Sequence, residues 1–186
     1  AMVPPVARTL KRKRLSAASL RPNPGSAPGL LRSNPLSHPT QIMVIAYGPE
    51  GYLEHPCQTL DEVERFLTVW PVVWVNVTGL ADVEAVERLG TLFNLDRLLL
   101  EDVLDTNHRA KVEFYEHYVF TILKGGVLAE QFESEQVSLF LKKNVVLVFQ
   151  ERPSHSFEQV RDRIRRGTGK IRLSGTDYLY YALIDE

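Results

Sequence analysis

The sequence contains one cysteine, Cys57, and no apolar run long enough to span a membrane. A single cysteine cannot form an intrachain disulfide, and this count favours a reducing compartment. A bilayer-spanning helix needs about 20 consecutive, mostly apolar residues, so no such helix is predicted in these 186 residues. No secretory signal is predicted either, because no apolar segment follows the basic N-terminus.

Acidic residues are missing from residues 1–40, which hold seven Lys and Arg and are rich in Pro, Ser and Ala. Residues 41–186 therefore carry 15 of the 22 basic residues and all 23 acidic ones, a net charge of −8. We predict a basic, poorly structured tail over 1–40 and an acidic α/β domain over 41–186. An acidic domain favours cations or basic surfaces as ligands and disfavours nucleic acid.

Catalytic patterns are also missing. No phosphate loop or dinucleotide fingerprint occurs, and Cys57, Ser138 and Ser174 lie in no recognisable nucleophile motif. The five histidines are scattered, with no pair spaced like a zinc site: His38, His55, His108, His117 and His155. The sequence therefore predicts that the chain is not an enzyme.

Apolar runs are present at residues 42–47, 72–77, 118–123, 135–141 and 145–149, and each predicts a strand. Polar residues with helix-capping chemistry precede amphipathic segments and predict helices after Thr59, Asp82, Ser156 and Asp177. A further helix is predicted to begin near Asp96. In residues 111–116 apolar residues largely alternate with charged ones, as in a strand solvated on one face. We expect residues 96–124 to form the centre of the domain, and Gly125-Gly126 to form a bulge or bend.

Carboxylates occupy the polar positions of the segment after Asp96: Glu101, Asp102 and Asp105. Neighbouring helical residues diverge by about 100°, so Glu101 and Asp102 do not easily clamp one ion together. The residue types and their spacing do not decide whether these three carboxylates form a cation site or the solvated face of a helix. The last helix ends in Asp185-Glu186, which opposes the helix dipole. We therefore expect the chain to be a fragment cut within a longer helix.

Several motifs in order resemble the cytoplasmic domain of CorA-type magnesium transporters. They are residues 100–104 (LEDVL), 109–116 (RAKVEFYE), 135–138 (EQVS), 149–151 (FQE), 160–165 (VRDRIR) and 177–185 (DYLYYALID). The resemblance runs from about residue 72 to the end. Ala110 stands where the family usually has proline.

The resemblance implies a three-layer α/β/α sandwich around a mixed, largely antiparallel sheet of about six or seven strands. It also implies a homopentameric inner-membrane channel for Mg²⁺ and Co²⁺, with this domain on the cytoplasmic side and the membrane helices beyond Glu186. Regulatory Mg²⁺ would bind between subunits and stabilise the closed state. Matched residue by residue, its ligands are Asp102 and Glu101, with Asp185 assisting.

Two alternatives stay open at this point. The domain could belong to a related Zn²⁺ transporter, or it could be a structural or oligomerisation module that senses no metal. The residues around the carboxylates do not decide between these three possibilities.

Overall fold

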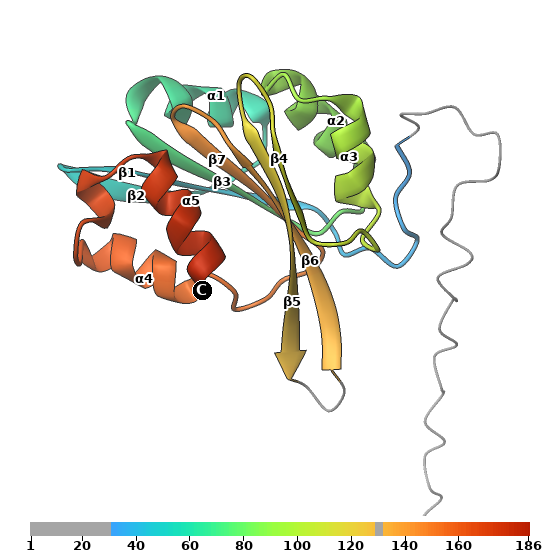
Figure 1. Cartoon of the computed structure of the whole chain (residues 1–186). Helices are drawn as coiled ribbons and strands as arrows, with labels where there is room; N and C mark the ends of the chain where they lie inside the picture. The colour runs from blue at the N-terminus through green and yellow to red at the C-terminus, as the bar shows by residue number, and fades with distance from the viewer. Residues whose placement is uncertain (1–30, 129–131) are drawn as a thin grey trace, which may run out of the picture.

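The computed structural model describes residues 31–128 and 132–186 of the chain (Figure 1). Its elements, in order, are β1 (Gln41–Gly48), β2 (Gly51–Cys57), α1 (Leu60–Val69), β3 (Val72–Thr78), α2 (Val83–Leu92), α3 (Arg97–Leu104), β4 (Lys111–Phe114), β5 (Val119–Leu128), β6 (Phe132–Leu141), β7 (Val145–Gln150), α4 (Glu158–Arg166), the 3₁₀ helix η2 (Ile171–Leu173) and α5 (Thr176–Asp185). None of the helices in these ranges is both long and apolar enough to cross a membrane.

The strands form one mixed sheet in the order β2-β1-β3-β7-β6-β5-β4. Strands β3 and β7 pair in parallel, and every other neighbouring pair is antiparallel. This confirms the expected mixed, largely antiparallel sheet of six or seven strands.

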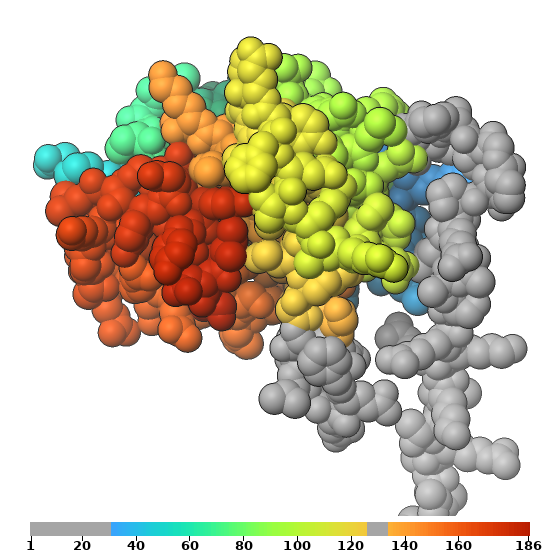
Figure 2. All heavy atoms as spheres, in the orientation of Figure 1, coloured from blue at the N-terminus to red at the C-terminus, as the bar shows by residue number. Residues whose placement is uncertain are grey.

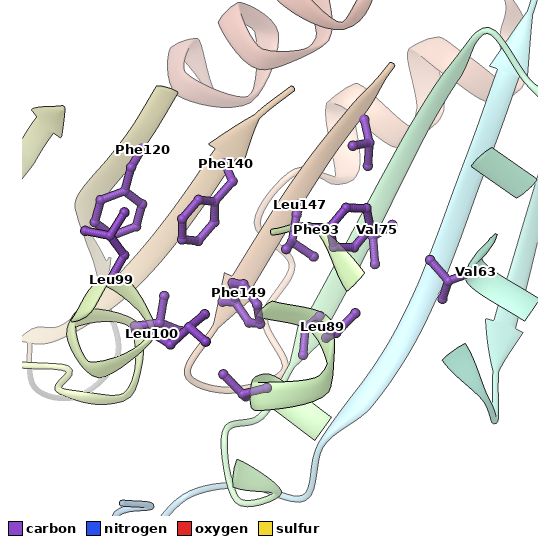
Figure 3. Packing of buried hydrophobic residues seen from close by; sticks show 14 of the residues in the cluster. Val63, Val75, Leu89, Phe93, Leu99, Leu100, Phe120, Phe140, Leu147 and Phe149 are labelled. Carbon is purple, nitrogen blue, oxygen red and sulfur yellow. The ribbon is translucent and has the colours of Figure 1, made fainter. Parts of the chain in front are cut away.

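Helices cover both faces of the sheet, as the three-layer prediction requires (Figure 1). Helices α1, α2 and α3 pack on one face, where Val63, Leu89 and Leu99 meet inward-facing residues of the strands. Figure 3 shows Leu99 and Leu100 beside Phe120 and Phe140 in this layer. Helices α4 and α5 cover the other face. Successive residues of β3 supply the two cores alternately, because side chains of a strand point to opposite faces in turn.

The expectation that residues 96–124 form the centre of the domain is wrong. Strand β7 lies at the centre of the sheet, while β4 is an edge strand and β5 is its neighbour. Of the bulge or bend expected at Gly125-Gly126, the bulge does not form, since β5 pairs with β6 without a break through Gly125↔Glu135 and Gly126↔Ser134. The central position of β7 comes from its pairing with the distant strand β3, which a local pattern does not contain.

The first turn of α4 is capped from a distant part of the chain. The expected cap, Ser156, does not lie at the N-cap position, where Phe157 stands with a left-handed φ of 69° and no side-chain cap. Instead the Glu186 carboxylate accepts hydrogen bonds from Gln159 N at 3.0 Å and Val160 N at 3.1 Å. A carboxylate at a helix N-terminus satisfies free amides and matches the dipole. Glu186 therefore has a structural role across the α4–α5 layer.

We predict that Glu186→Ala lowers the free energy of unfolding by about 0.5–2 kcal/mol, the range for loss of a helix cap. The measurement is urea denaturation followed by circular dichroism. Asp185→Ala is the matched control, because Asp185 is exposed and next in sequence. Its change is expected to stay within about 0.5 kcal/mol. Equal losses in the two variants would contradict a specific cap.

Candidate metal centre

Helix α3 places the carboxylates predicted to bind metal at the surface of the domain. Asp96 begins the helix, and its side chain accepts a hydrogen bond from Leu98 N at 2.9 Å. Leu99, Leu100, Val103 and Leu104 are buried against the sheet, which leaves Glu101 and Asp102 half-buried at the rim. The apolar side of α3 thus fixes the direction in which these two carboxylates leave the helix.

Asp102 is held by two cationic or potentially cationic groups within the same chain. One carboxylate oxygen accepts a hydrogen bond from Lys111 Nζ at 2.7 Å, and the other lies 3.0 Å from His108 Nε2. The side chain of Asp102 is only 18% exposed. Each carboxylate oxygen can accept more than one hydrogen bond or metal contact. Asp102 therefore has remaining acceptor capacity while it is paired.

Lys111 connects Asp102 to a second carboxylate on β4. Its ammonium lies 3.1 Å from Glu113 Oε1 and 5.4 Å from the centre of the Phe120 ring. Burial opposes the charged form of Lys111, but the hydrogen bonds to Asp102 and Glu113 hold its pKa above the usual range. The hydrogen bond from Lys111, with a further one from Tyr115 at 3.0 Å, lowers the pKa of Glu113.

The faces of β4 are reversed relative to the sequence prediction. Lys111 and Glu113 are half-buried beside α3, whereas Val112 and Phe114 are exposed by 53% and 81%. Leu98 of α3 is also exposed, by 51%. The ion pairs to Asp102 hold the charged side of this edge strand inward, and its apolar residues face out. Figure 2 shows the yellow and yellow-green atoms of this segment on the outside of the molecule.

The end of α3 is tied to the sheet by side-chain hydrogen bonds to carbonyl groups. Gln136 Nε2 on β6 donates to the carbonyls of Asp102 at 2.9 Å and Asp105 at 3.3 Å. Lys124 Nζ on β5 donates to the Thr106 carbonyl at 2.7 Å. These contacts fix the end of α3, with the backbone of Asp102, relative to β5 and β6.

Asp185 lies away from this cluster within one copy of the chain. It is the exposed last residue of α5, whose buried residues belong to the opposite face of the sheet from those of α3. Within residues 31–128 and 132–186, Glu101, Asp102 and Asp185 do not form a group of three ligands close enough for one ion. The role of these three residues stays a prediction.

Sequence reasoning missed His108 and Lys111 as partners of Asp102. It classed the histidines as scattered and treated Lys111 as a solvated strand residue. One signal was available: Lys111 and Glu113 are two apart in a strand, so they share a face. Their contact with Asp102 could not be foreseen, because it depends on where α3 packs relative to the edge of the sheet.

Comparison with known proteins places this geometry in context. The model of a family described as CorA-like Mg²⁺ transporter protein matches residues 71–186. The chain is 40% identical over 179 residues to the cobalt/magnesium transport protein CorA of Thermotoga maritima, a match that covers 95% of the chain and 50% of that protein. The chain thus spans about half the length of this relative.

Solved structures share the fold at low sequence identity. The soluble domain of CorA from Methanocaldococcus jannaschii superposes with a TM-score of 0.55 and 16% identity, over 77% of this chain and 54% of that one. The ZntB cytoplasmic domain from Vibrio parahaemolyticus gives a TM-score of 0.59 and 11% identity, over 78% and 56%. These matches agree with the observed α/β architecture.

The Lys111–Glu113 contact predicts a pH-dependent contribution to stability. Because the folded-state pKa of Glu113 is lowered, its contribution is present above the unfolded pKa of about 4.3 and is lost as the pH falls through the folded value. Glu113→Gln is expected to cost at most about 1 kcal/mol at neutral pH, since the pair is partly exposed. Urea denaturation from about pH 7 to about pH 3 checks this, and the two proteins should converge in acid. A constant difference across that range would contradict the ionic origin.

Proposed function

The chain belongs to the CorA-like Mg²⁺ transporter family, and on this basis we propose that it forms the regulatory domain of a divalent-cation transporter. The observation that carries the proposal is the 40% identity, over 95% of the chain, to a protein named for cobalt and magnesium transport. The proposed cargo is Mg²⁺ together with Co²⁺. In the longer protein this domain lies on the cytoplasmic side of an inner membrane and assembles as a homopentamer.

We propose further that Mg²⁺ binds between copies of the domain through Asp102, with Glu101 and Asp185 contributing. Mg²⁺ keeps several waters and takes only one or two carboxylates, so it suits an interface to which each copy offers few ligands. Two features support this assignment. Asp102 has spare acceptor capacity at the rim of the domain, and α3 and α5 lie on opposite faces of one copy.

Lys111 supplies the physical basis for a reversible response. Without Mg²⁺ its ammonium neutralises Asp102 at 2.7 Å. When Mg²⁺ binds Asp102, Lys111 keeps a second carboxylate partner in Glu113 at 3.1 Å. The ion must therefore compete with an internal cation, which weakens its apparent affinity. Weak binding suits a sensor that empties when the cytosolic concentration falls.

Exposed apolar residues on α3 and β4 also support contact with another copy. Leu98, Val112 and Phe114 are each more than half exposed on α3 and β4. Val112 and Phe114 share the face of β4 opposite to Lys111, and exposed apolar side chains of this size are typical of interaction surfaces. Ion bridging by carboxylates and burial of these side chains would act together, so Mg²⁺ is expected to favour self-association.

The basic tail over residues 1–40 stays a prediction, as does the boundary with the domain at residue 41. Just before β1, the His38 carbonyl accepts a hydrogen bond from Ala81 N at 3.1 Å, and Thr40 Oγ1 accepts one from Asp82 N at 3.0 Å. The end of the proposed tail is thus attached to the start of α2. That the chain has no enzymatic activity also stays a prediction.

We predict that Mg²⁺ binds the wild-type chain in the millimolar range and increases its self-association, and that Asp102→Asn loses both effects. Isothermal titration and sedimentation equilibrium measure them. Asp61→Asn removes an exposed carboxylate from the first turn of α1 and serves as the matched control.

Unchanged Mg²⁺ binding in Asp102→Asn would remove Asp102 from the proposed role. The absence of any Mg²⁺ effect on the wild type would favour a structural module. The same titration with Zn²⁺ tests the remaining alternative, in which the domain serves a Zn²⁺ transporter.

A further inference from the structure

Three side chains with different metal-binding chemistry meet where the edge strand β2 leads into α1. They are His55, Cys57 and Glu62, and their potential ligand atoms all lie within 4.8 Å of one another. This group lies before residue 71, where the match to the family model begins. Neither the proposed Mg²⁺ site nor the family match therefore accounts for it.

The local fold brings these residues together. His55 and Cys57 are two apart in β2, so their side chains leave the same face of the sheet. Cys57 belongs to the same core layer as Val63 of α1. Pro56 lies between them on an edge strand, where its missing amide hydrogen is tolerated and its fixed φ stiffens the pair. Only Gln58 and Thr59 separate β2 from α1, so Glu62 in the first turn of α1 faces back toward the strand.

Glu62 does not make the capping box that its spacing from Thr59 predicts. Thr59 makes no side-chain cap, and Glu62 Oε2 accepts a hydrogen bond from Gln58 N at 2.9 Å. The same oxygen lies 3.6 Å from His55 Nε2. The hydrogen bond from Gln58 N holds the Glu62 carboxylate beside the imidazole. Metal ligands are commonly oriented by such a hydrogen bond from a neighbouring group.

The distances suit a tetrahedral ion after a small adjustment. Ligand atoms about 2.0–2.3 Å from Zn²⁺ at tetrahedral angles lie about 3.3–3.6 Å from one another. The His55–Glu62 distance of 3.6 Å is already in this range. The hydrogen bond from Cys57 Sγ to the His55 carbonyl is long, at 3.9 Å. A modest movement of the thiol completes three corners of the tetrahedron.

The ligand set selects against Mg²⁺. Thiolate and imidazole favour Zn²⁺ and later transition metals, whereas Mg²⁺ prefers oxygen ligands. A divalent ion bound to one thiolate, one carboxylate and a neutral imidazole carries no net charge, which reduces the cost of its partial burial. Burial, with the charge of Glu62, raises the pKa of the Cys57 thiol to about 11, so binding at neutral pH must release a proton.

We propose that His55, Cys57 and Glu62 form a binding site for Zn²⁺ or a similar thiophilic divalent cation, distinct from the Mg²⁺ site. The half-exposed imidazole of His55, at 44%, gives the ion a route of entry and leaves a fourth position for water. Bound metal joins β2 to α1.

The test uses Co²⁺ as a spectroscopic substitute for Zn²⁺ on the whole chain. Cys57 is the only cysteine, so any thiolate-to-Co²⁺ charge-transfer band reports this residue. We expect one Co²⁺ per chain with such a band, displacement by Zn²⁺, and no displacement by excess Mg²⁺. Cys57→Ser should abolish the band, and His55→Ala and Glu62→Gln should each weaken Zn²⁺ binding by at least about tenfold.

Two control variants make the result specific. His117→Ala removes a more exposed histidine, at 69%, and should leave Zn²⁺ binding unchanged. Asp102→Asn should keep the Co²⁺ band. The band therefore tests this site alone, and the Mg²⁺ proposal can fail without affecting it. A folded wild-type chain without the band would overturn the proposal. So would equal Zn²⁺ affinity in wild type, His55→Ala and Glu62→Gln, variants that leave the buried thiol intact.

Discussion

The pairing of Asp102 with Lys111 is the interaction on which the candidate Mg²⁺ site depends. It joins α3 to β4 through a contact of 2.7 Å at the rim of the domain. A carboxylate with no cation beside it would repel the other acidic groups of this acidic domain. Lys111 relieves that repulsion and also provides a competitor for any incoming ion. The same contact therefore joins α3 to β4 within one copy and, in the proposed site, would limit the affinity for metal.

This pairing also explains the exposed side of β4. An edge strand with charged residues outward would be protected from association. Here Lys111 and Glu113 turn toward α3, and Val112 and Phe114 face outward instead. Because side chains alternate along β4, turning the charged residues toward α3 also exposes the apolar ones. The proposed assembly uses both, with Mg²⁺ bridging carboxylates on the α3 side of the sheet and with the apolar residues of β4 exposed on the other side.

Local patterns in the sequence predicted most of the elements but not their neighbours. The buried runs of β3 and β7, the Asp82 cap and the start of α3 near Asp96 follow from residue type and spacing, and the structure confirms them. The edge position of β4, the cap from Glu186 to α4 and the partners of Asp102 are different. Each joins segments that are distant in the sequence or packed from different layers, so no local period reports them. His55 and Cys57 are two residues apart in the sequence. They could not be recognised as candidate metal ligands, because the third ligand, Glu62, comes close to them only through the packing of α1.

Competition between Lys111 and a divalent cation for Asp102 is the basis of the proposed Mg²⁺ response. Its most direct test is the affinity of the chain for Mg²⁺ after Lys111→Met, measured by isothermal titration beside Lys170→Met, which removes an exposed lysine near the distant 3₁₀ helix. Removing a cation within about 4 Å of a partly buried site changes the local electrostatic energy by up to about 4 kcal/mol before screening. The account predicts that Lys111→Met binds Mg²⁺ at least about tenfold more tightly, equivalent to about 1.4 kcal/mol, while Lys170→Met matches the wild type. Equal or weaker Mg²⁺ binding by a folded Lys111→Met protein would contradict it.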